Sequence, residues 1–355
     1  MCCYYKDFGG CSIEILKECD IDAFMLFMSD NLSVDSILAK SRAFIKKQFY
    51  RANEKCYNFL VAKSKKTKEI IGVLGFVDTY FYEARNLDEN FTWFTNWLVK
   101  KTAEPIVGIQ LLYSAYQLKT PSLFGAVGLS DIALSIYKKL RYRTGELTQY
   151  YMQNPEKKPY LITGSGKNGS EHCFRRNRRW NIEIVKNSER TEIGTDAKPQ
   201  KSLRYLYQKY CLNAFYPYEL YSVAENTESR GYVVLKEDQH NGVKALRIVD
   251  FIGDEECFRY GGSAFYELMV EREAEFLDCY CYGIDPKNMV EGGFLQNEMT
   301  DEIVVPCYFE PFCRANIPIH FAYQLPKEAR FTVFKGDGDR EFPRILDGYD
   351  DCGRS

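Results

Sequence analysis

The sequence predicts a mixed α/β protein built from two halves that share one order of elements. The chain has 355 residues, which is long for one hydrophobic core. Its composition, 45% hydrophobic and 27% charged, is that of a globular protein. Stretches with strand alternation and helical periodicity are interleaved in both halves. We therefore expect an N-terminal domain (1–153), a basic connector (154–179), a C-terminal domain (180–345) and a tail (346–355).

In the first half, apolar periodicity and turn residues place the elements in order. The polar turn 64–68 predicts a hairpin, Pro105 suits a first helical turn, and Ser130 can cap a helix. Alternation in 91–99 puts Phe91, Trp93, Thr95, Trp97 and Val99 on one face. Strands are expected at 12–16, 57–63, 69–79, 91–99, 123–127 and 147–152, and helices at 20–30, 34–50, 105–119 and 130–140.

The second half repeats this order with little similarity in sequence. Strands are expected at 181–185, 232–236, 245–252 and 276–282, and helices at 201–214, 263–273 and 286–291. The connector carries seven Lys or Arg and only one acid, Glu171, between Lys157 and Arg179. Such a run suits either phosphate or RNA binding, or a solvated linker.

Composition excludes several classes of function. A net charge of −2 gives no positive field for nucleic acid, and no apolar run approaches the length of a membrane span. Thirteen Cys and three scattered His predict buried, reduced thiols and no metal site. The first residues lack the apolar stretch of a signal peptide, so we expect a cytoplasmic protein.

The helix after the strand 123–127 carries a recognisable spacing. Ala133, Tyr137, Lys139 and Tyr142 match the A-x-x-x-Y-x-K-x-G-[FY] pattern of the GNAT acyltransferases, with Arg141 in place of the glycine. The segment 100–108 is similar to that superfamily's pyrophosphate loop, although only its last glycine, Gly108, is present. The resemblance implies a tandem GNAT fold.

The same resemblance implies acyl-CoA as co-substrate and a bulged strand near 95–98, whose backbone N–H groups face the thioester oxygen. Tyr137 and Trp97 are the expected catalytic residues, with a core tyrosine as the alternative for Tyr137. A phosphate turn at Gly261-Gly262-Ser263 remains a second possible CoA site. The residues expected to contact CoA are Asn96, Trp97, Leu98, Val99, Lys100, Lys101, Val107, Gly108, Ile109 and Ser130.

Residues 305–312 and 334–339 resemble a narrower bacterial subgroup of two-domain GNAT proteins from surface-polysaccharide synthesis. The subgroup implies an acetyl-CoA or 3-hydroxybutanoyl-CoA donor and a nucleotide-linked (dTDP) 3-amino-3,6-dideoxy sugar as acceptor. Cys307 and the segment 340–342 depart from it, which leaves the acceptor open. Residues expected at the acceptor are Tyr308, Glu310, Asn316, Asp337 and Asp339, while His320 suits a structural role better than that of a base.

Two other functions fit the same sequence. A FemABX-like transferase, also a tandem GNAT protein, uses aminoacyl-tRNA and is favoured by the basic connector. A degenerate GNAT protein that only binds a ligand or partner is favoured by the incomplete glycine loop. The sequence does not specify the oligomeric state.

Overall fold

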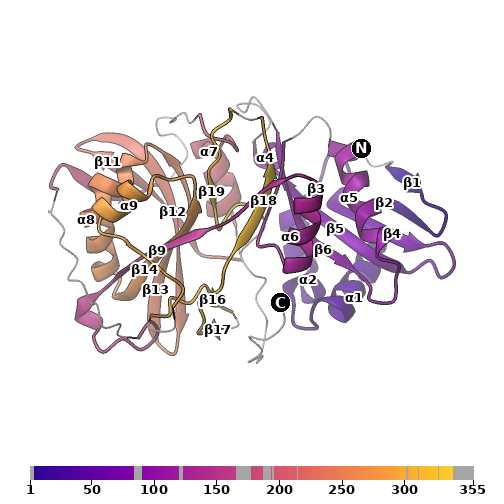
Figure 1. Ribbon diagram of the computed structural model, residues 1–355, viewed down its shortest axis with the longest axis horizontal. Helices are drawn as coiled ribbons and strands as arrows, with labels where there is room; N and C mark the ends of the chain where they lie inside the picture. Colours follow the sequence, from indigo (N-terminus) through magenta and orange to yellow (C-terminus); the bar gives the residue numbers. More distant parts are fainter. Residues whose placement is uncertain are drawn as a thin grey trace.

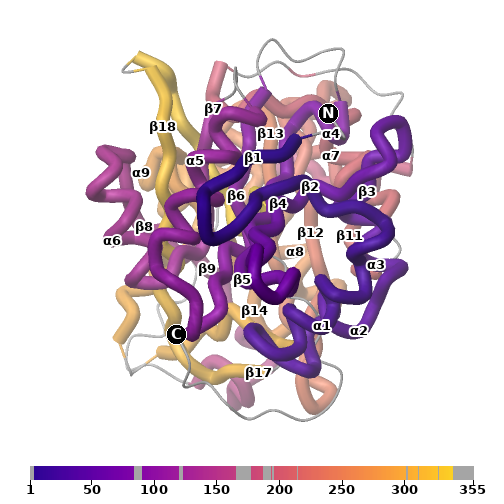
Figure 2. The backbone as a smooth tube through the Cα atoms, turned by 90° about the vertical axis from the view of Figure 1, so that its right-hand side faces the viewer, coloured from indigo at the N-terminus to yellow at the C-terminus, as the bar shows by residue number. Residues whose placement is uncertain are grey.

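A computed structural model describes residues 4–83, 90–119, 123–164, 177–186, 193, 196–213, 215–300, 303–310, 312–326 and 328–338. It contains two large mixed sheets that lie side by side, each with helices packed on it (Figure 1). Figure 2 presents the first half end-on, with the strands of its sheet between α5 and α1.

The elements of residues 1–153 follow the predicted order. They are β1 (Tyr5–Asp7), β2 (Cys11–Lys17), η1 (Glu18–Asp20), α1 (Ile21–Asn31), α2 (Ile37–Lys40), α3 (Arg42–Phe49), β3 (Tyr50–Arg51), β4 (Cys56–Ser64), β5 (Ile70–Asp78), α4 (Thr79–Tyr82), β6 (Phe91–Val99), α5 (Ile106–Lys119), β7 (Leu123–Val127), α6 (Asp131–Lys139), β8 (Arg143–Glu146) and β9 (Thr148–Gln153).

The elements after residue 153 include short strands that alternation alone does not reveal. They are η2 (Pro155–Lys157), β10 (Trp180–Ile184), α7 (Leu203–Leu206), the π-helical turn η3 (Tyr207–Cys211), β11 (Tyr218–Glu225), β12 (Glu228–His240), β13 (Val243–Gly253), α8 (Glu256–Glu271), β14 (Ala274–Tyr282), α9 (Pro286–Glu291), β15 (Leu295–Gln296), β16 (Tyr308–Phe309), β17 (Phe312–Cys313), β18 (His320–Gln324) and β19 (Val333–Phe334).

The two sheets exchange strands. The first has the order β1-β2-β4-β5-β6-β7-β18-β8, and the second has the order β10-β11-β12-β13-β14-β9-β15. Figure 1 shows β18 crossing into the first half and β9 into the second. The prediction that 147–152 closes the first sheet is therefore wrong. The strand β9 is buried along most of its length, and it gains partners on both edges, β14 and β15, only in the second sheet.

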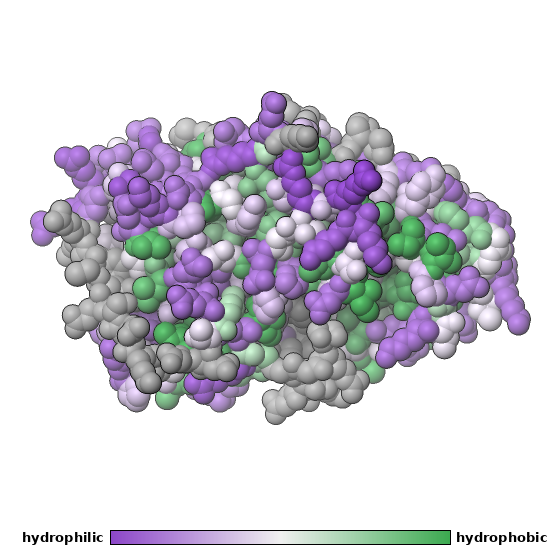
Figure 3. Space-filling model, viewed as in Figure 1, coloured by the Kyte–Doolittle hydropathy of each residue, from purple (hydrophilic) through white to green (hydrophobic). Residues whose placement is uncertain are grey.

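Each sheet buries both faces. In the first, Phe94 and Leu60 face α5, whereas Phe59 and Val61 pack under α1 and α3. In the second, α8 covers one face and α7 the other. Between the halves, Trp93 and Phe91 of β6 pack with Tyr280 of β14. Hydrophilic side chains cover much of the face seen in Figure 3, interspersed with hydrophobic ones.

Candidate functional site

The parallel strands β6 and β7 stop pairing halfway along β6. Their pairing runs from Phe91 with Leu123 to Phe94 with Ala126 and ends there. β7 finishes one residue later at Val127, while β6 continues along β5 to Val99. We call the region between the strands beyond Phe94 and Ala126 the first opening. The helix α5 begins beside it, after the turn 100–105.

The strand β6 is bulged where the first opening begins. Its register against β5 shifts between Thr95, opposite Gly75, and Leu98, opposite Val73, and Asn96 has a positive φ of 48°. A bulge inserts one extra residue and reverses the alternation of side chains beyond it. Trp97 therefore packs on the α5 side of the sheet, opposite to Trp93. The prediction that these two tryptophans share a face is wrong for this reason.

Trp97 reaches from β6 towards α6 across the first opening. Its ring centroid lies 5.9 Å from that of Tyr137, in an edge-on arrangement. The indole Nε1 lies 3.4 Å from where a Cβ on Gly108 would be, and it is buried without a hydrogen-bond partner. Tyr137 is 1% exposed, and burial raises the pKa of its phenol well above the ordinary 10.0. The Tyr137 ring thus faces Trp97 and Tyr142.

The start of α5 is only partly available to a phosphate. The Val107 and Gly108 amides donate to the carbonyls of Glu104 and Pro105, at 3.0 and 3.2 Å. Lys101 is exposed and the Lys100 Nζ lies 3.5 Å from Glu69, and both residues belong to the turn that leads into this helix. A cation there suits a diphosphate, as does the helix dipole.

The other residues expected at CoA have defined surroundings. Ile109 is partly exposed on α5, and Val99 lies 3.4 Å from the Cβ position of Gly108. Leu98 packs on the opposite face, under α1 and α3. The Ser130 hydroxyl accepts from the Ala133 amide at 3.4 Å, so this side chain caps α6 as expected.

The second half has a corresponding opening, and the chain itself fills it. The parallel strands β13 and β14 pair as far as Ile248 and Cys279, and a register shift opposite Val234 and Leu235 bulges β13 at Val249. We call the region beyond this pairing the second opening. The strand β19 pairs with the end of β14, and the Gly336 amide donates to the Val249 carbonyl at 2.8 Å. Main chain thus occupies the second opening, whereas beside the first opening the Trp97 ring lies against Gly108 of α5 and Tyr137 of α6.

A buried charge cluster anchors the filling segment 333–337. The Lys201 Nζ lies 2.6 Å from Asp250 and 2.8 Å from Asp337, and both carboxylates are fully buried. Tyr210 donates to Asp250 at 2.7 Å. Burial raises the pKa of Asp337. For Lys201, burial lowers the pKa, but the attraction of the two carboxylates is stronger, so the pKa of Lys201 is raised. The expectation that Asp337 holds an acceptor is wrong, because its carboxyl group is enclosed in this cluster.

The glycines of α8 do not form a phosphate turn. Helix α8 begins at Glu256, so Gly261 and Gly262 lie inside it. A Cβ on Gly262 would come within 1.9 Å of the Gly292 carbonyl oxygen, which shows that this glycine permits close packing of α8 on the end of α9. The expected phosphate site at 261–263 is thus a helix-packing contact.

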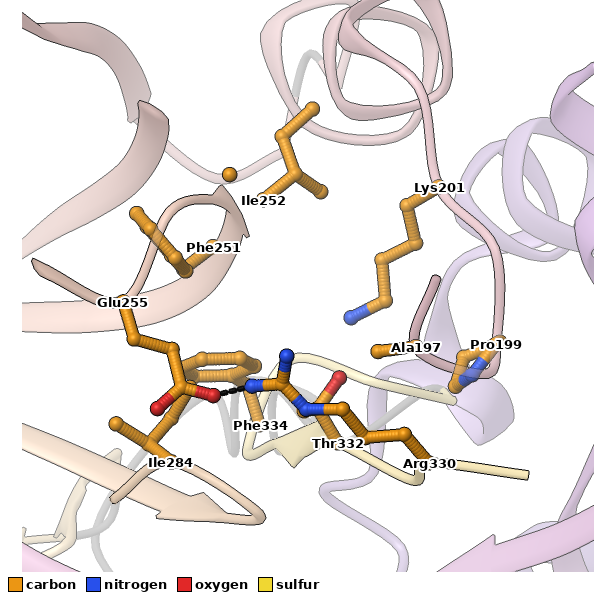
Figure 4. Close-up of a pocket in the computed structure, with 11 residues that line it drawn as sticks. Ala197, Pro199, Lys201, Phe251, Ile252, Glu255, Ile284, Arg330, Thr332 and Phe334 are labelled. Atoms are coloured by element: carbon orange, nitrogen blue, oxygen red, sulfur yellow. Dashed lines mark ion pairs between the residues drawn. The ribbon is translucent and has the colours of Figure 1, made fainter. Parts of the chain in front are cut away.

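The start of α8 is acidic. The Asp254 carboxylate accepts from the Glu256 amide at 3.0 Å, and Glu255 is the N-cap residue. A small pocket there is lined mainly by apolar residues, and the polar side chains of Lys201 and Thr332 also line it. In this pocket Arg330 points at Glu255 and forms an ion pair with it (Figure 4). Asp254 likewise lies 2.9 Å from the Arg230 guanidinium, so both carboxylates at this helix end have a cationic partner.

The residues expected at the acceptor are scattered. Tyr308 is half-buried, with the Lys335 Nζ 5.2 Å from its ring centre, and Glu310 is exposed beside it. Asn316 bonds to Val305, Ile303, Thr300 and Asn297, so it ties one loop together. His320 lies 3.7 Å from Glu146 at the edge of β18. Asp339 falls outside the described residues.

Lys201 and Asp250 are buried residues that no motif in the sequence predicts. They are far apart in the chain, and only the inserted segment 333–337 brings Asp337 to them. The one available hint was the carboxylate of Asp250 inside the apolar run 245–252, since a buried charge needs a partner.

The described cysteines are free thiols, as expected, with one exception. Eight of the described cysteines are free thiols, but Cys313 is disulfide-bonded, so the prediction of uniformly reduced cysteines is wrong. Among the described residues, no three His, Cys, Asp or Glu side chains gather as a metal site. Nor is any helix in that part of the chain long and apolar enough to cross a membrane.

Comparisons with solved structures identify the fold. A GCN5-related N-acetyltransferase from Anabaena variabilis superposes with a TM-score of 0.54 at 9% identity, over 88% of this chain and 72% of its own. A candidate acetyltransferase from Pyrococcus horikoshii superposes with a TM-score of 0.50 at 12% identity, over 92% of this chain and 93% of its own. A GCN5-related N-acetyltransferase from Kribbella flavida superposes with a TM-score of 0.50 at 11% identity, over 88% of this chain and 69% of its own.

Comparisons of sequence return no counterpart: no family model matches the chain, and no curated protein matches it significantly. The structural likeness, together with a bulged strand and a parallel neighbour in each half, confirms the predicted tandem GNAT fold.

Proposed function

We propose that this protein is an acyl-CoA-dependent N-acyltransferase that uses the first opening as its CoA site. The observation that carries the proposal is the separation of β6 from β7 at the Asn96 bulge, beside the start of α5. This geometry leaves strand-edge amides and a helix N-terminus on one path, which suits a pantetheine arm followed by a diphosphate. The solved structures supply the fold, and their names point to the same chemistry.

The residues of the first opening suit attack of an amine on a thioester. The bulge at Asn96 offers backbone N–H groups around Trp97 that can stabilise the oxyanion of the tetrahedral intermediate. An amine of pKa about 8 is partly neutral at pH 7, so positioning rather than a strong base supplies most of the acceleration. The raised pKa keeps the Tyr137 phenol protonated, which suits a hydrogen-bond donor to the leaving thiolate.

For the acceptor, we propose the amine of a nucleotide-linked (dTDP) 3-amino-3,6-dideoxy sugar in surface-polysaccharide synthesis. The support is the resemblance of 305–312, together with the accessibility of Glu310 and the partial exposure of Tyr308. Either acetyl-CoA or 3-hydroxybutanoyl-CoA is the donor. A positive side chain near Tyr308, Lys335, donates to the Cys307 carbonyl at 2.7 Å and holds this segment against the second opening.

The Trp97 indole favours one alternative, a GNAT fold that binds a partner without catalysis, because it occupies the first opening. A thiol-release assay separates the two. Acetyl-CoA and 3-hydroxybutanoyl-CoA are each mixed with a panel of dTDP-amino sugars, and release of free CoA thiol is followed. Release with one pair supports the transferase; no release with any pair, despite CoA binding in a thermal-shift titration, supports the binding protein.

Tyr137→Phe tests the role assigned to the phenol. We expect a fall in kcat of about tenfold to a hundredfold with little change in the acceptor KM, since a lost proton donor weakens only the transition state. Circular dichroism of the variant serves as the folding control. An unchanged kcat removes Tyr137 from the mechanism.

A further inference from the structure

Trp97 differs from the other described tryptophans in its surroundings. Trp93 and Trp180 are 1% and 7% exposed and belong to hydrophobic cores. Trp97 is only half-buried, and it lies beyond the point where β6 has lost its partner β7. Its ring lies edge-on to Tyr137 and beside Gly108, and it packs against the core cluster on the α5 side of the sheet. Unlike the other two rings it is not fully enclosed, so solvent reaches part of it.

The indole N–H of Trp97 has no acceptor in this position. Nε1 is buried and unpartnered. A buried donor without a partner destabilises the arrangement that contains it, because the hydrogen bond to water is lost and not replaced. Rotation of the side chain into solvent returns a hydrogen bond to Nε1, at the expense of the contacts of the ring with Tyr137, Gly108 and the core beside them. Trp93 has an unpartnered Nε1 as well, but its ring is sealed between the halves and has no such exit.

On the basis of the proposed function, we propose that Trp97 is the gate of the CoA site. In the free protein the indole closes the first opening between Gly108 and Tyr137. Acyl-CoA enters when this side chain rotates out, which exposes Tyr137 to the reacting thioester. The gate accounts for the full burial of Tyr137 in a protein whose chemistry needs that phenol at the sulfur. It also keeps water out of the first opening until the donor binds.

Fluorine NMR of the full chain labelled with 5-fluorotryptophan tests the gate directly. The chain has three tryptophans, so Trp97→Phe assigns the Trp97 signal. On titration with CoA, we expect this signal to move towards its position in the urea-unfolded chain, while the Trp180 signal stays in place. Trp180 lies in the second half, so it reports any general change in the protein.

Calorimetric titration with CoA supplies the second readout. Trp97→Ala removes the closed position, so we expect its Kd to be about tenfold lower than that of the wild type if the gate is closed in nine molecules out of ten. Trp180→Phe is the matched control and keeps the wild-type Kd. Thermal melting establishes that both variants fold; if Trp97→Ala does not, the fluorine spectra of the wild-type chain decide.

The outcomes separate the gate from the CoA site. CoA binding with an unmoved Trp97 signal and an unchanged Kd in Trp97→Ala makes Trp97 a fixed wall and overturns the gate alone. Binding to Trp97→Ala but not to the wild type supports a gate that is shut. No binding of CoA to either protein overturns the proposed function together with the gate.

Discussion

The first and second openings share one backbone plan and have opposite contents. Each is a bulged strand that separates from its parallel neighbour beside the start of a helix. Beside the first, the side chain of Trp97 lies against Tyr137 and Gly108, where we propose that it acts as a gate. In the second, residues 333–337 lie there as main chain, bonded to both β13 and β14 and held by a buried lysine.

The two openings also differ in the charged residues at the start of the neighbouring helix. Lys100 and Lys101 precede α5, with Lys100 paired to Glu69. Asp254 and Glu255 lie at the start of α8, where Arg230 and Arg330 pair with them. We propose that only the first opening serves as a ligand site, because main chain already fills the second. The second opening holds residues 333–337 of the same chain.

The largest effect is expected from removing the cation of the second opening. Lys201→Ala leaves Asp250 and Asp337 buried without a counter-charge, and we expect the free energy of unfolding to fall by about 3–5 kcal/mol. Urea denaturation measures it. Lys40→Ala, which breaks the more exposed pair with Asp35, is the control and should cost less than about 1 kcal/mol. A loss for Lys201→Ala as small as that of the control would show that segment 333–337 is not anchored by charge.

The glycines in the two helices should respond in opposite directions. Gly262→Ala forces a methyl group against the Gly292 carbonyl oxygen, and we expect a loss of about 3 kcal/mol. Gly108→Ala meets ordinary contacts of 3.4 Å to Trp97 and Val99, and alanine favours a helix, so stability should rise by about 0.5–1 kcal/mol. Thermal melts of the two variants compare them. Equal losses would contradict the idea that only α8 uses its glycine for packing.

These glycines also show where reading the sequence succeeds. The strands β4 to β7 and helices α5, α6 and α9 begin and end within about two residues of the prediction, because alternation, helical spacing and capping by Ser130 are local signals. The start of α8 was missed by several residues, because Gly261-Gly262 reads as a turn until α9 is seen to pack against it. The predicted position of the bulge, near 95–98, is confirmed, but the bulge also turns the Trp97 side chain to the other face of the sheet, which alternation alone does not predict.

The exchange of strands was beyond local signals. Nothing within Thr148–Gln153 or His320–Gln324 specifies which sheet it joins, since that choice depends on edges 100 or more residues away. The same limit applies to the candidate site. The opening beside α5 follows from motif and spacing, whereas the filling of the second opening depends on Asp337 meeting Lys201 across the fold.

Alkaline pH should destabilise both openings through their buried phenols. Burial raises the pKa of Tyr210 in the second half and of Tyr137 in the first well above 10.0. Above pH 10 the unfolded chain therefore loses these protons while the native protein keeps them, so stability is full below pH 10 and falls as pH rises. Each such tyrosine contributes about 1.4 kcal/mol per pH unit. Urea denaturation from pH 9 to 11 gives the slope of the unfolding free energy against pH. We expect this slope to fall by the contribution of about one proton in Tyr210→Phe and in Tyr137→Phe. An unchanged slope in either variant would place that phenol in contact with solvent.

The smallest effect concerns the charges beside the first opening. Lys100→Glu with Lys101→Glu should weaken CoA binding about tenfold at low salt, since each partly exposed ion pair contributes up to about 1 kcal/mol. The matched control reverses another adjacent basic pair, Lys46 and Lys47 on α3, which covers the opposite face of the same sheet. Calorimetry at low and at high salt should show the difference between the variants shrinking as salt screens the charges. If both double variants bind CoA equally well, the diphosphate does not lie at the start of α5, and the contrast between the two openings would rest on their filling alone.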